Sequence, residues 1–118
     1  VYKLQYNLWK SWTLLETGAN EGIPFESGID AERGWKIRNK APSIVVAVID
    51  SGIRYTHEDL AGNMWHNANP VSGDLYGTNA VANNGDPMDD EGHGTHCAGI
   101  IGALGDNGIG ITGVAWSH

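Results

Sequence analysis

The most informative absence in this 118-residue chain is positive charge in its second half. All seven Lys and Arg lie in the first 54 residues beside six acids, whereas residues 55–118 contain eight acids and neither Lys nor Arg. The net charge of −7 therefore belongs to the second half. Because nucleic-acid binding needs clustered basic side chains, we expect no nucleic-acid partner. Cations that bind through oxygen suit such a composition, and so does a simply soluble acidic surface.

Cysteine and long apolar runs are also scarce. Cys97 is the only cysteine, so the chain forms no internal disulfide, and its redox compartment stays open. No apolar run is long enough to cross a membrane, so we expect no membrane partner. No signal-peptide pattern follows Val1, as expected of a mature secreted chain or a trimmed one. The length suffices for one small domain.

The stretch from Asp89 to Leu104 carries the clearest chemical pattern. Acids and glycine come first, then His93 and His96, then a run of small and apolar residues. Apolar residues at steps of three or four predict a helix with one buried face, formed by Cys97, Ile100, Ile101 and Leu104. This places His93 at the mouth of the helix. A histidine there is a candidate general base, and it needs a carboxylate to orient its ring.

Asp50 is the candidate carboxylate. It follows the continuous apolar run Ser43–Ile49, which is typical of a strand buried on both faces of a parallel sheet. Active sites in open α/β sheets collect at the carboxyl ends of the strands. An acid in that position is costly unless a partner satisfies it. The alternative is that Asp50 only caps a turn.

Together the two stretches resemble the subtilisin-like serine proteases, the subtilases. Val45–Gly52 is similar to the family's aspartate motif, and His93–Gly99 is similar to its histidine motif. The cysteine at position 97 of this second motif resembles the thermitase branch of the family. The resemblance covers the chain from about Ile29 onward. It implies an α/β fold, namely the incomplete N-terminal part of one doubly wound, mainly parallel-sheet catalytic domain. Residues 1–28 would form an N-terminal arm, and residues 29–118 the start of the α/β core.

The same resemblance implies a serine endopeptidase acting on polypeptides, with Asp50 and His93 in a Ser-His-Asp triad. The order Asp then His is that of subtilisin. None of the six serines stands in a Gly-Thr-Ser-Met-Ala-like motif. We therefore expect the serine to come from a C-terminal part of the domain, which becomes a required partner. The 118 residues alone should be inactive. Secretion is implied by the resemblance only.

The resemblance also implies calcium as a structural cofactor. The loop after the predicted helix matches the thermitase calcium loop in length, and the implied ligands are Asp59, the side chain of Asn107 and the carbonyls of Leu104, Ile109 and Ile111. A turn-rich surface loop is the alternative. The long Asn- and Asp-rich segment 62–92 suggests a second cation site, with oxygens from Asn79, Asn84, Asp86, Asp89 and Asp90. It lacks the ligand spacing of an EF-hand.

Two local expectations concern single elements. Residues 29–37 predict a short helix, with Asp30 as its N-cap and Trp35 on its buried face. In the stretch Ile53–Leu60, the resemblance gives His57 a structural part and Asp59 the calcium-binding one.

Three other functions stay open. Asp50-Ser-Gly with Ile100-Ile-Gly102 distantly resembles a dimeric aspartic protease, although this leaves the histidine run unexplained. Alternatively, His93, His96 and a nearby acid bind a transition metal. A third alternative is a non-catalytic calcium-binding fragment or pseudoprotease.

Overall fold

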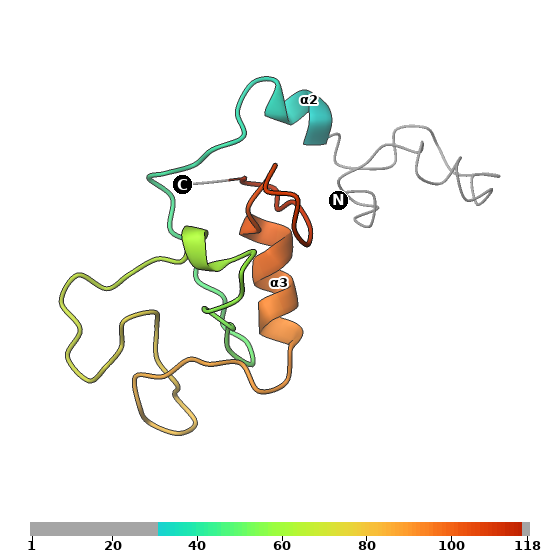
Figure 1. The fold of residues 1–118 in the computed structure, drawn as a ribbon. Helices are drawn as coiled ribbons and strands as arrows, with labels where there is room; N and C mark the ends of the chain where they lie inside the picture. The colour runs from blue at the N-terminus through green and yellow to red at the C-terminus, as the bar shows by residue number, and fades with distance from the viewer. Residues whose placement is uncertain (1–30, 117–118) are drawn as a thin grey trace.

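The computed structural model describes residues 31–116, without the side chain of Glu32. In chain order these residues form α2 (Ala31–Trp35), the 3₁₀ turn η2 (Ala61–Asn63) and α3 (His93–Gly102). In Figure 1, α3 stands at the centre, and the loops between η2 and α3 extend away from it on one side. The predicted arm 1–28 and the predicted cap Asp30 lie outside the described residues. The short helix expected near Trp35 is present as α2.

The predicted strand Ser43–Ile49 does not form a buried strand here. An isolated β-bridge joins Asn79 and Asn84, and Lys40 is also a bridge residue, but none of the residues 43–49 takes part in a β-bridge. The apolar run is largely exposed: Ile44, Val45, Val46 and Ile49 expose 64%, 64%, 54% and 98% of their surface. A strand of a parallel sheet is buried only when other strands flank it and helices cover its faces. The described part of the chain supplies no second strand for this run.

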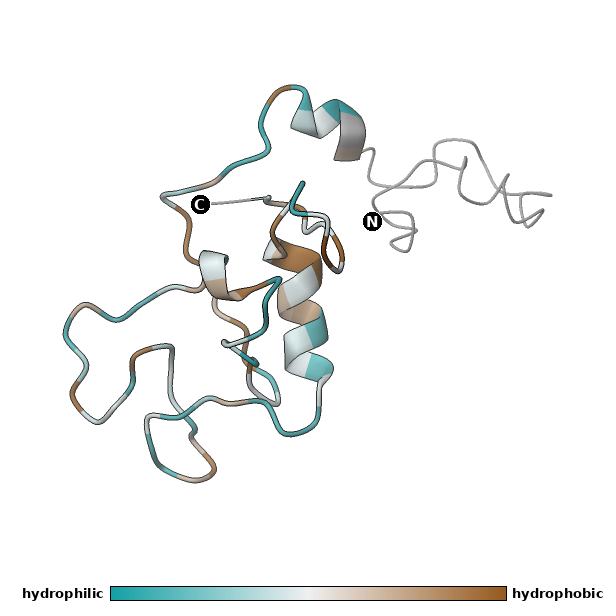
Figure 2. Cartoon of the chain, viewed as in Figure 1, coloured by the Kyte–Doolittle hydropathy of each residue, from teal (hydrophilic) through white to brown (hydrophobic). Residues whose placement is uncertain are grey.

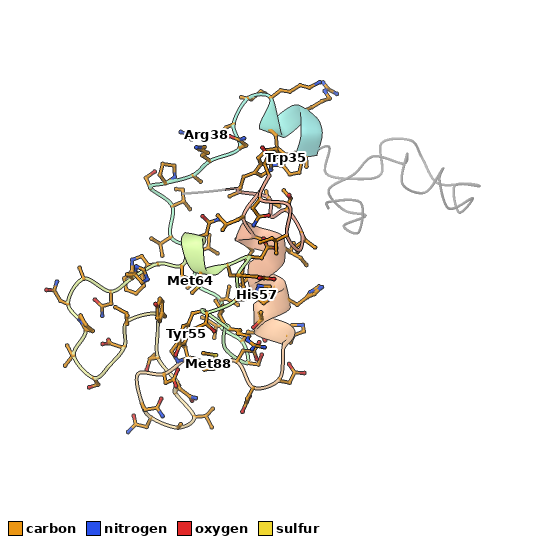
Figure 3. The ribbon with its side chains drawn as sticks, in the orientation of Figure 1. Trp35, Arg38, Tyr55, His57, Met64 and Met88 are labelled. Atoms are coloured by element: carbon orange, nitrogen blue, oxygen red, sulfur yellow. The ribbon has the colours of Figure 1, made fainter. Side chains whose placement is uncertain are left out.

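A small core holds the described residues together. Leu60, Ala98 and Ala103 are buried, and four partly buried side chains pack around them: Val48, Ile53, Met64 and Ile111. Met64 is labelled in Figure 3, where it lies between η2 and α3. The core therefore joins one side of α3 to the segment that follows Asp50.

Helix α3 forms where the sequence predicts a helix, but its buried face differs from the predicted one. The fully buried helix residues are Gly94, Ala98 and Gly99, and the helix ends at Gly102, before Leu104. Cys97, Ile100 and Ile101 are only half-buried. Figure 2 shows the reason: α3 is hydrophilic at its start and hydrophobic at its end, so its polarity changes mainly along the axis. Gly94 is buried because the Gly52 backbone approaches it closely, Gly99 lies against the Ile111 side chain, and Ala98 belongs to the apolar core.

The segment after α3 folds back onto the end of the helix. The backbone N–H groups of Gly113, Val114 and Ala115 donate to the carbonyls of Ala103, Ile100 and Ile101 at 2.9–3.0 Å. From α2, the Trp35 ring N–H donates to the Val114 carbonyl at 2.8 Å (Figure 3). Helix α2 is thereby tied to α3 through this segment. No helix of the described chain is long and apolar enough to cross a membrane.

Candidate active site

The structure brings Asp50 and His93 together. Nδ1 of His93 lies 2.9 Å from Oδ1 and 2.8 Å from Oδ2 of Asp50, although 43 residues separate the two in sequence. The His93 side chain is 66% exposed and that of Asp50 is 21% exposed. An imidazole that holds a carboxylate at Nδ1 has its other nitrogen, Nε2, left for chemistry. In the described part of the chain, Nε2 has no hydrogen-bond partner.

The pair shifts the pKa of both partners in opposite directions. The Ser51 backbone N–H, 2.7 Å from Oδ1, and then the bond to His93 lower the pKa of Asp50. The hydrogen bond to Asp50 and the negative charge of its carboxylate raise the pKa of His93. Asp50 therefore stays ionised beside an imidazole that accepts a second proton more readily than a free one.

Asp89 organises the backbone around this pair. Its Oδ1 accepts the N–H groups of Glu91 and Gly92 at 3.0 and 2.8 Å and the Ser51 hydroxyl at 2.9 Å. Its Oδ2 accepts both the N–H and the hydroxyl of Thr95. These hydrogen bonds hold the pKa of Asp89 far below its usual range, and the bond from the Thr95 hydroxyl contributes most. The carboxylate thus satisfies free N–H groups at the start of α3.

The hydroxyl groups of Ser51 and Thr95 extend the hydrogen-bond network of Asp89. The Ser51 hydroxyl accepts the Gly94 N–H at 2.9 Å, and the Thr95 hydroxyl accepts the Arg54 N–H at 2.9 Å. Asp89 is therefore linked to two residues that follow Asp50, Ser51 directly and Arg54 through Thr95, and to the first turn of α3. The sequence analysis assigned Asp89 only as a possible cation ligand and missed this role. The available signal was an acid four residues before a helix that begins without a capping side chain.

Glycine at position 94 allows the two segments to meet. A Cβ atom on Gly94 would overlap the backbone carbonyl of Gly52. Gly52 itself has a φ of 121°, which side chains rarely tolerate, and a Cβ there would meet the Pro87 carbonyl. The helix start and the turn after Asp50 are thus in direct backbone contact, which brings the His93 ring within reach of the carboxylate.

Of the first predicted calcium ligands, Asp59 contacts the Asn107 side chain and the backbone of Ile111. Asp59 is buried, with 2% of its surface exposed. Its Oδ1 accepts the Asn107 amide at 2.8 Å, and its Oδ2 accepts the Ile111 N–H at 2.8 Å. Gly110 lies so close that a Cβ there would overlap Oδ2. Among the described residues, the carbonyls of Leu104, Ile109 and Ile111 accept no backbone hydrogen bond.

The second predicted set is not gathered around one point by its side-chain bonds. The Asn79 side-chain oxygen accepts the N–H groups of Val81 and Ala82, and that of Asn84 accepts the Asp86 N–H. Asp86 accepts the Tyr55 hydroxyl at 3.1 Å and the Met88 N–H at 3.1 Å, and the hydrogen bond to Asp86 raises the pKa of Tyr55. The Asn79 and Asn84 oxygens are thus engaged in local turns, and Asp86 bonds both a local N–H and the distant Tyr55 hydroxyl.

His96 and His57 lie apart from the pair. His96 is exposed, and His57 accepts the Asp59 N–H at Nδ1, 3.1 Å away, within its own turn. Both line a mainly apolar pocket of about 230 Å³ beside α3 that includes neither Asp50 nor His93. In the described part of the chain the hydrogen-bonded partner of the Asp50 carboxylate on another segment is a histidine, His93.

Comparisons with known proteins agree with this geometry. Residues 41–118 match the Peptidase S8 model, described as the subtilase family. Subtilisin-like protease 1 of Plasmodium berghei (strain Anka) is 45% identical over 89 residues, which cover 64% of this chain and 15% of that protein. The protein of the same name from Plasmodium vivax is 48% identical over 89 residues, 64% of this chain and 14% of its own length.

A bacterial relative extends the match toward the N-terminus. The cell wall-associated protease of Bacillus subtilis (strain 168) is 38% identical over 105 residues, which cover 87% of this chain and 11% of that protein. The chain therefore spans about one seventh or less of the length of these curated relatives.

Proposed function

The chain belongs to the subtilase family, and on that premise we propose that it supplies the aspartate and histidine of a serine endopeptidase. The single observation that carries the proposal is the bond of 2.8–2.9 Å between Nδ1 of His93 and the Asp50 carboxylate. The reaction is the hydrolysis of peptide bonds, and the substrate is a polypeptide.

The proposed mechanism uses both imidazole nitrogens. Nδ1–H donates to Asp50, which fixes the tautomer and the ring orientation, so that Nε2 is free to take the proton of a serine hydroxyl. As the proton arrives, the carboxylate stabilises the imidazolium, in line with the raised pKa of His93. His93 later returns the proton to the leaving amine.

The nucleophile is assigned to a serine outside these 118 residues. Ser51 is the serine next to the pair, but its hydroxyl is engaged by Asp89 and by the Gly94 N–H. None of the six serines has the Gly-Thr-Ser context that the family's nucleophile requires. The 118 residues alone are therefore proposed to be inactive.

The fold and location form part of the same proposal. Ser43–Ile49 would become a strand of a mainly parallel, doubly wound sheet once neighbouring strands cover it, and its exposed apolar side chains support this. We further propose that the protein is secreted, in keeping with the name of the Bacillus subtilis relative, cell wall-associated protease.

Calcium is proposed as a structural cofactor held by Asp59, Asn107 and the carbonyls of Leu104, Ile109 and Ile111. The donor types fit, because carboxylate, amide and carbonyl oxygens are all ligands that calcium accepts, and Asp59 is buried. The Asn107 oxygen accepts the Ile109 N–H at 3.1 Å while its amide N–H donates to Asp59, so the amide would turn over on binding the ion. When bound, the ion would supply charge compensation for Asp59. The second set, Asn79, Asn84 and Asp86, stays a prediction.

The test of catalysis compares two histidines on the same helix. In the protein at its full natural length, His93→Ala should lower kcat for a peptide substrate by about 10⁴-fold or more. His96→Ala should leave it nearly unchanged, because His96 does not contact Asp50. A fluorophosphonate probe should label one serine in the unmodified protein. Equal loss in both variants, or no labelling, would contradict the proposal.

Calcium is tested by thermal unfolding. Added Ca²⁺ should raise the melting midpoint of the unmodified protein, because it binds the folded state. Asp59→Asn should abolish this increase while the exposed neighbour variant Glu58→Gln keeps it. A calcium effect that survives in Asp59→Asn would remove Asp59 from the site.

A further inference from the structure

Cys97 adds a third metal-ligating side chain to the Asp50–His93 pair. Its Sγ lies 3.9 Å from Nδ1 of His93. One ligand atom from each of the three residues, the Asp50 carboxylate, His93 and Cys97, lies within 4.8 Å of the other two. Within residues 31–116 this is the one group of three His, Cys, Asp or Glu side chains gathered so closely.

The arrangement follows from the helix. His93 and Cys97 are four residues apart in α3, so their side chains leave the same face one turn from each other. Asp50 reaches the same point from the turn before Gly52. Since His93 is largely exposed and Cys97 half-buried, the group is open to solvent on one side. A site with three protein ligands and an open fourth position is the usual form of a solvent-accessible zinc site.

The distances are close to those of a tetrahedral zinc ion. With Zn–N and Zn–O near 2.1 Å and Zn–S near 2.3 Å, the nitrogen and oxygen ligands lie about 3.4 Å apart, and nitrogen and sulfur about 3.6 Å apart. The structure has 2.8 Å and 3.9 Å for these two separations. Shifts of roughly 0.5 Å would bring these two separations to zinc geometry. The Asp50 oxygen and the Cys97 sulfur lie within 4.8 Å of each other, so they would have to close to about 3.6 Å on the same ion.

We propose that the three side chains bind Zn²⁺, with a water molecule in the fourth position. Nδ1 of His93, one oxygen of Asp50 and the Cys97 thiolate are the ligands. The carboxylate and the thiolate balance the charge of the ion. Binding releases one proton from the thiol, while the imidazole stays neutral and its proton moves from Nδ1 to Nε2. The thiolate selects zinc over calcium and magnesium.

This assignment differs from the transition-metal alternative considered for the sequence. That alternative paired His93 with His96, three residues along the helix. In the structure, His96 lies outside the group, and Cys97 takes its place. The two assignments predict opposite effects for substitutions at positions 96 and 97.

Zinc would also switch off the proposed chemistry, a consequence that rests on the proposed function. With the metal on Nδ1, Nε2 carries the proton and becomes a donor. It then has no free lone pair to accept the proton of a serine hydroxyl. Asp50 is likewise withdrawn from its role in orienting the ring. Zn²⁺ is therefore expected to inhibit peptide hydrolysis reversibly.

The experiment uses Co²⁺ as a spectroscopic substitute for zinc in the full-length protein, with calcium present to fill the oxygen sites. A thiolate bound to Co²⁺ gives a charge-transfer band in the near ultraviolet. We expect this band at one equivalent of cobalt, and we expect Zn²⁺ to displace it. The band should be absent in Cys97→Ser and in His93→Gln, and present in His96→Ala.

The affinity for Zn²⁺, measured by competition with a chromophoric chelator, should fall by about tenfold or more in Cys97→Ser. Substituting a residue that only hydrogen-bonds a metal ligand already lowers metal affinity by about that factor. Melting curves recorded without metal show whether each variant is folded. If Cys97→Ser does not fold, the loss of the cobalt band in His93→Gln tests the metal site instead. No band in the unmodified protein, a band kept in Cys97→Ser, or a band lost in His96→Ala would overturn the proposal. Cobalt binding by a protein that hydrolyses no peptide when it is free of transition metal would leave the metal site standing and reject the proposed function alone.

Discussion

Asp50 and the apolar run directly before it are neighbours in sequence but differ in how they are held. The Asp50 carboxylate is fixed by His93 and by the Ser51 N–H, within a network centred on Asp89. The run Ile44–Ile49, by contrast, exposes most of its large side chains. The pairing of the two candidate catalytic residues therefore depends on a local network of polar bonds and close backbone contacts, and not on burial of the apolar run before Asp50.

The largest effect is expected from a substitution that breaks the hydrogen-bonded pair of Asp50 and His93. Asp50→Asn keeps the size of the side chain but removes the charge and the preferred tautomer of His93. We expect kcat for a peptide substrate to fall about 10⁴-fold in the full-length protein. Asp90→Asn is the control, because Asp90 is exposed and makes no hydrogen bond with another described residue. Steady-state hydrolysis measures both, and a similar activity in Asp50→Asn and Asp90→Asn would remove Asp50 from the mechanism.

The next largest effect is expected from a substitution of Asp89, the centre of the hydrogen-bond network, which leaves Asp50 and His93 unchanged. Asp89→Ala deletes five hydrogen bonds that connect Ser51, Thr95 and the start of α3. A displacement of about 1 Å between Asp50 and His93 should lower kcat about 10²-fold. Thr95→Val, which removes only the hydroxyl, should have a smaller effect in the same direction. If Asp89→Ala retains full kcat, the network does not position the pair.

A third prediction tests whether the exposed run is covered in the full-length protein. If the proposed sheet forms there, Val46→Thr places a hydroxyl in a buried strand and lowers the free energy of unfolding by about 1–2 kcal/mol. Val81→Thr is the matched control, because Val81 is 100% exposed, and it should stay within about 0.5 kcal/mol. Urea unfolding measures both. Equal small changes would mean that the sheet does not cover this position.

The smallest effect concerns the proton of His93. Its pKa is raised by the bond to Asp50, so the stability contributed by the charged pair is fully present below the ordinary histidine pKa of about 6.5. That contribution is lost as the pH rises through the raised value. In Asp50→Asn, an NMR titration should show the pKa of His93 shifted downward. The His93→Ala spectrum identifies the resonance, and an unchanged pKa would contradict the pair.

The comparison also explains what the sequence could and could not predict. Asp50 and His93 stand in two motifs of recognisable composition, and their proximity was expected from those motifs. The helix was expected as well, because apolar residues recur at helical spacing. Its buried face was predicted wrongly, since Gly94 is buried against the Gly52 backbone and Gly99 lies against the Ile111 side chain, contacts that hydrophobic spacing does not register.

For the predicted strand Ser43–Ile49, the sequence pattern did not predict the exposure seen in the structure. The run Ser43–Ile49 has the composition of a buried strand, yet burial of a strand depends on neighbouring strands, and the described residues contain none for this run. Asp89 was missed as a structural centre because its partners, Ser51 and Thr95, lie on two separate segments. The composition around Asp89 indicated only an acidic loop. The roles of Asp50, His93 and the calcium ligands stay predictions until they are tested.

The contact between Gly94 and Gly52 has a consequence for the mutational tolerance of the protein. If even one methyl group at position 94 would displace α3 from the turn after Asp50, a saturation mutagenesis library selected for activity should return glycine codons at this position. Position 52 should behave in the same way, for the separate reason of its backbone angle. Two residues without side chains would then be among the least replaceable in the chain.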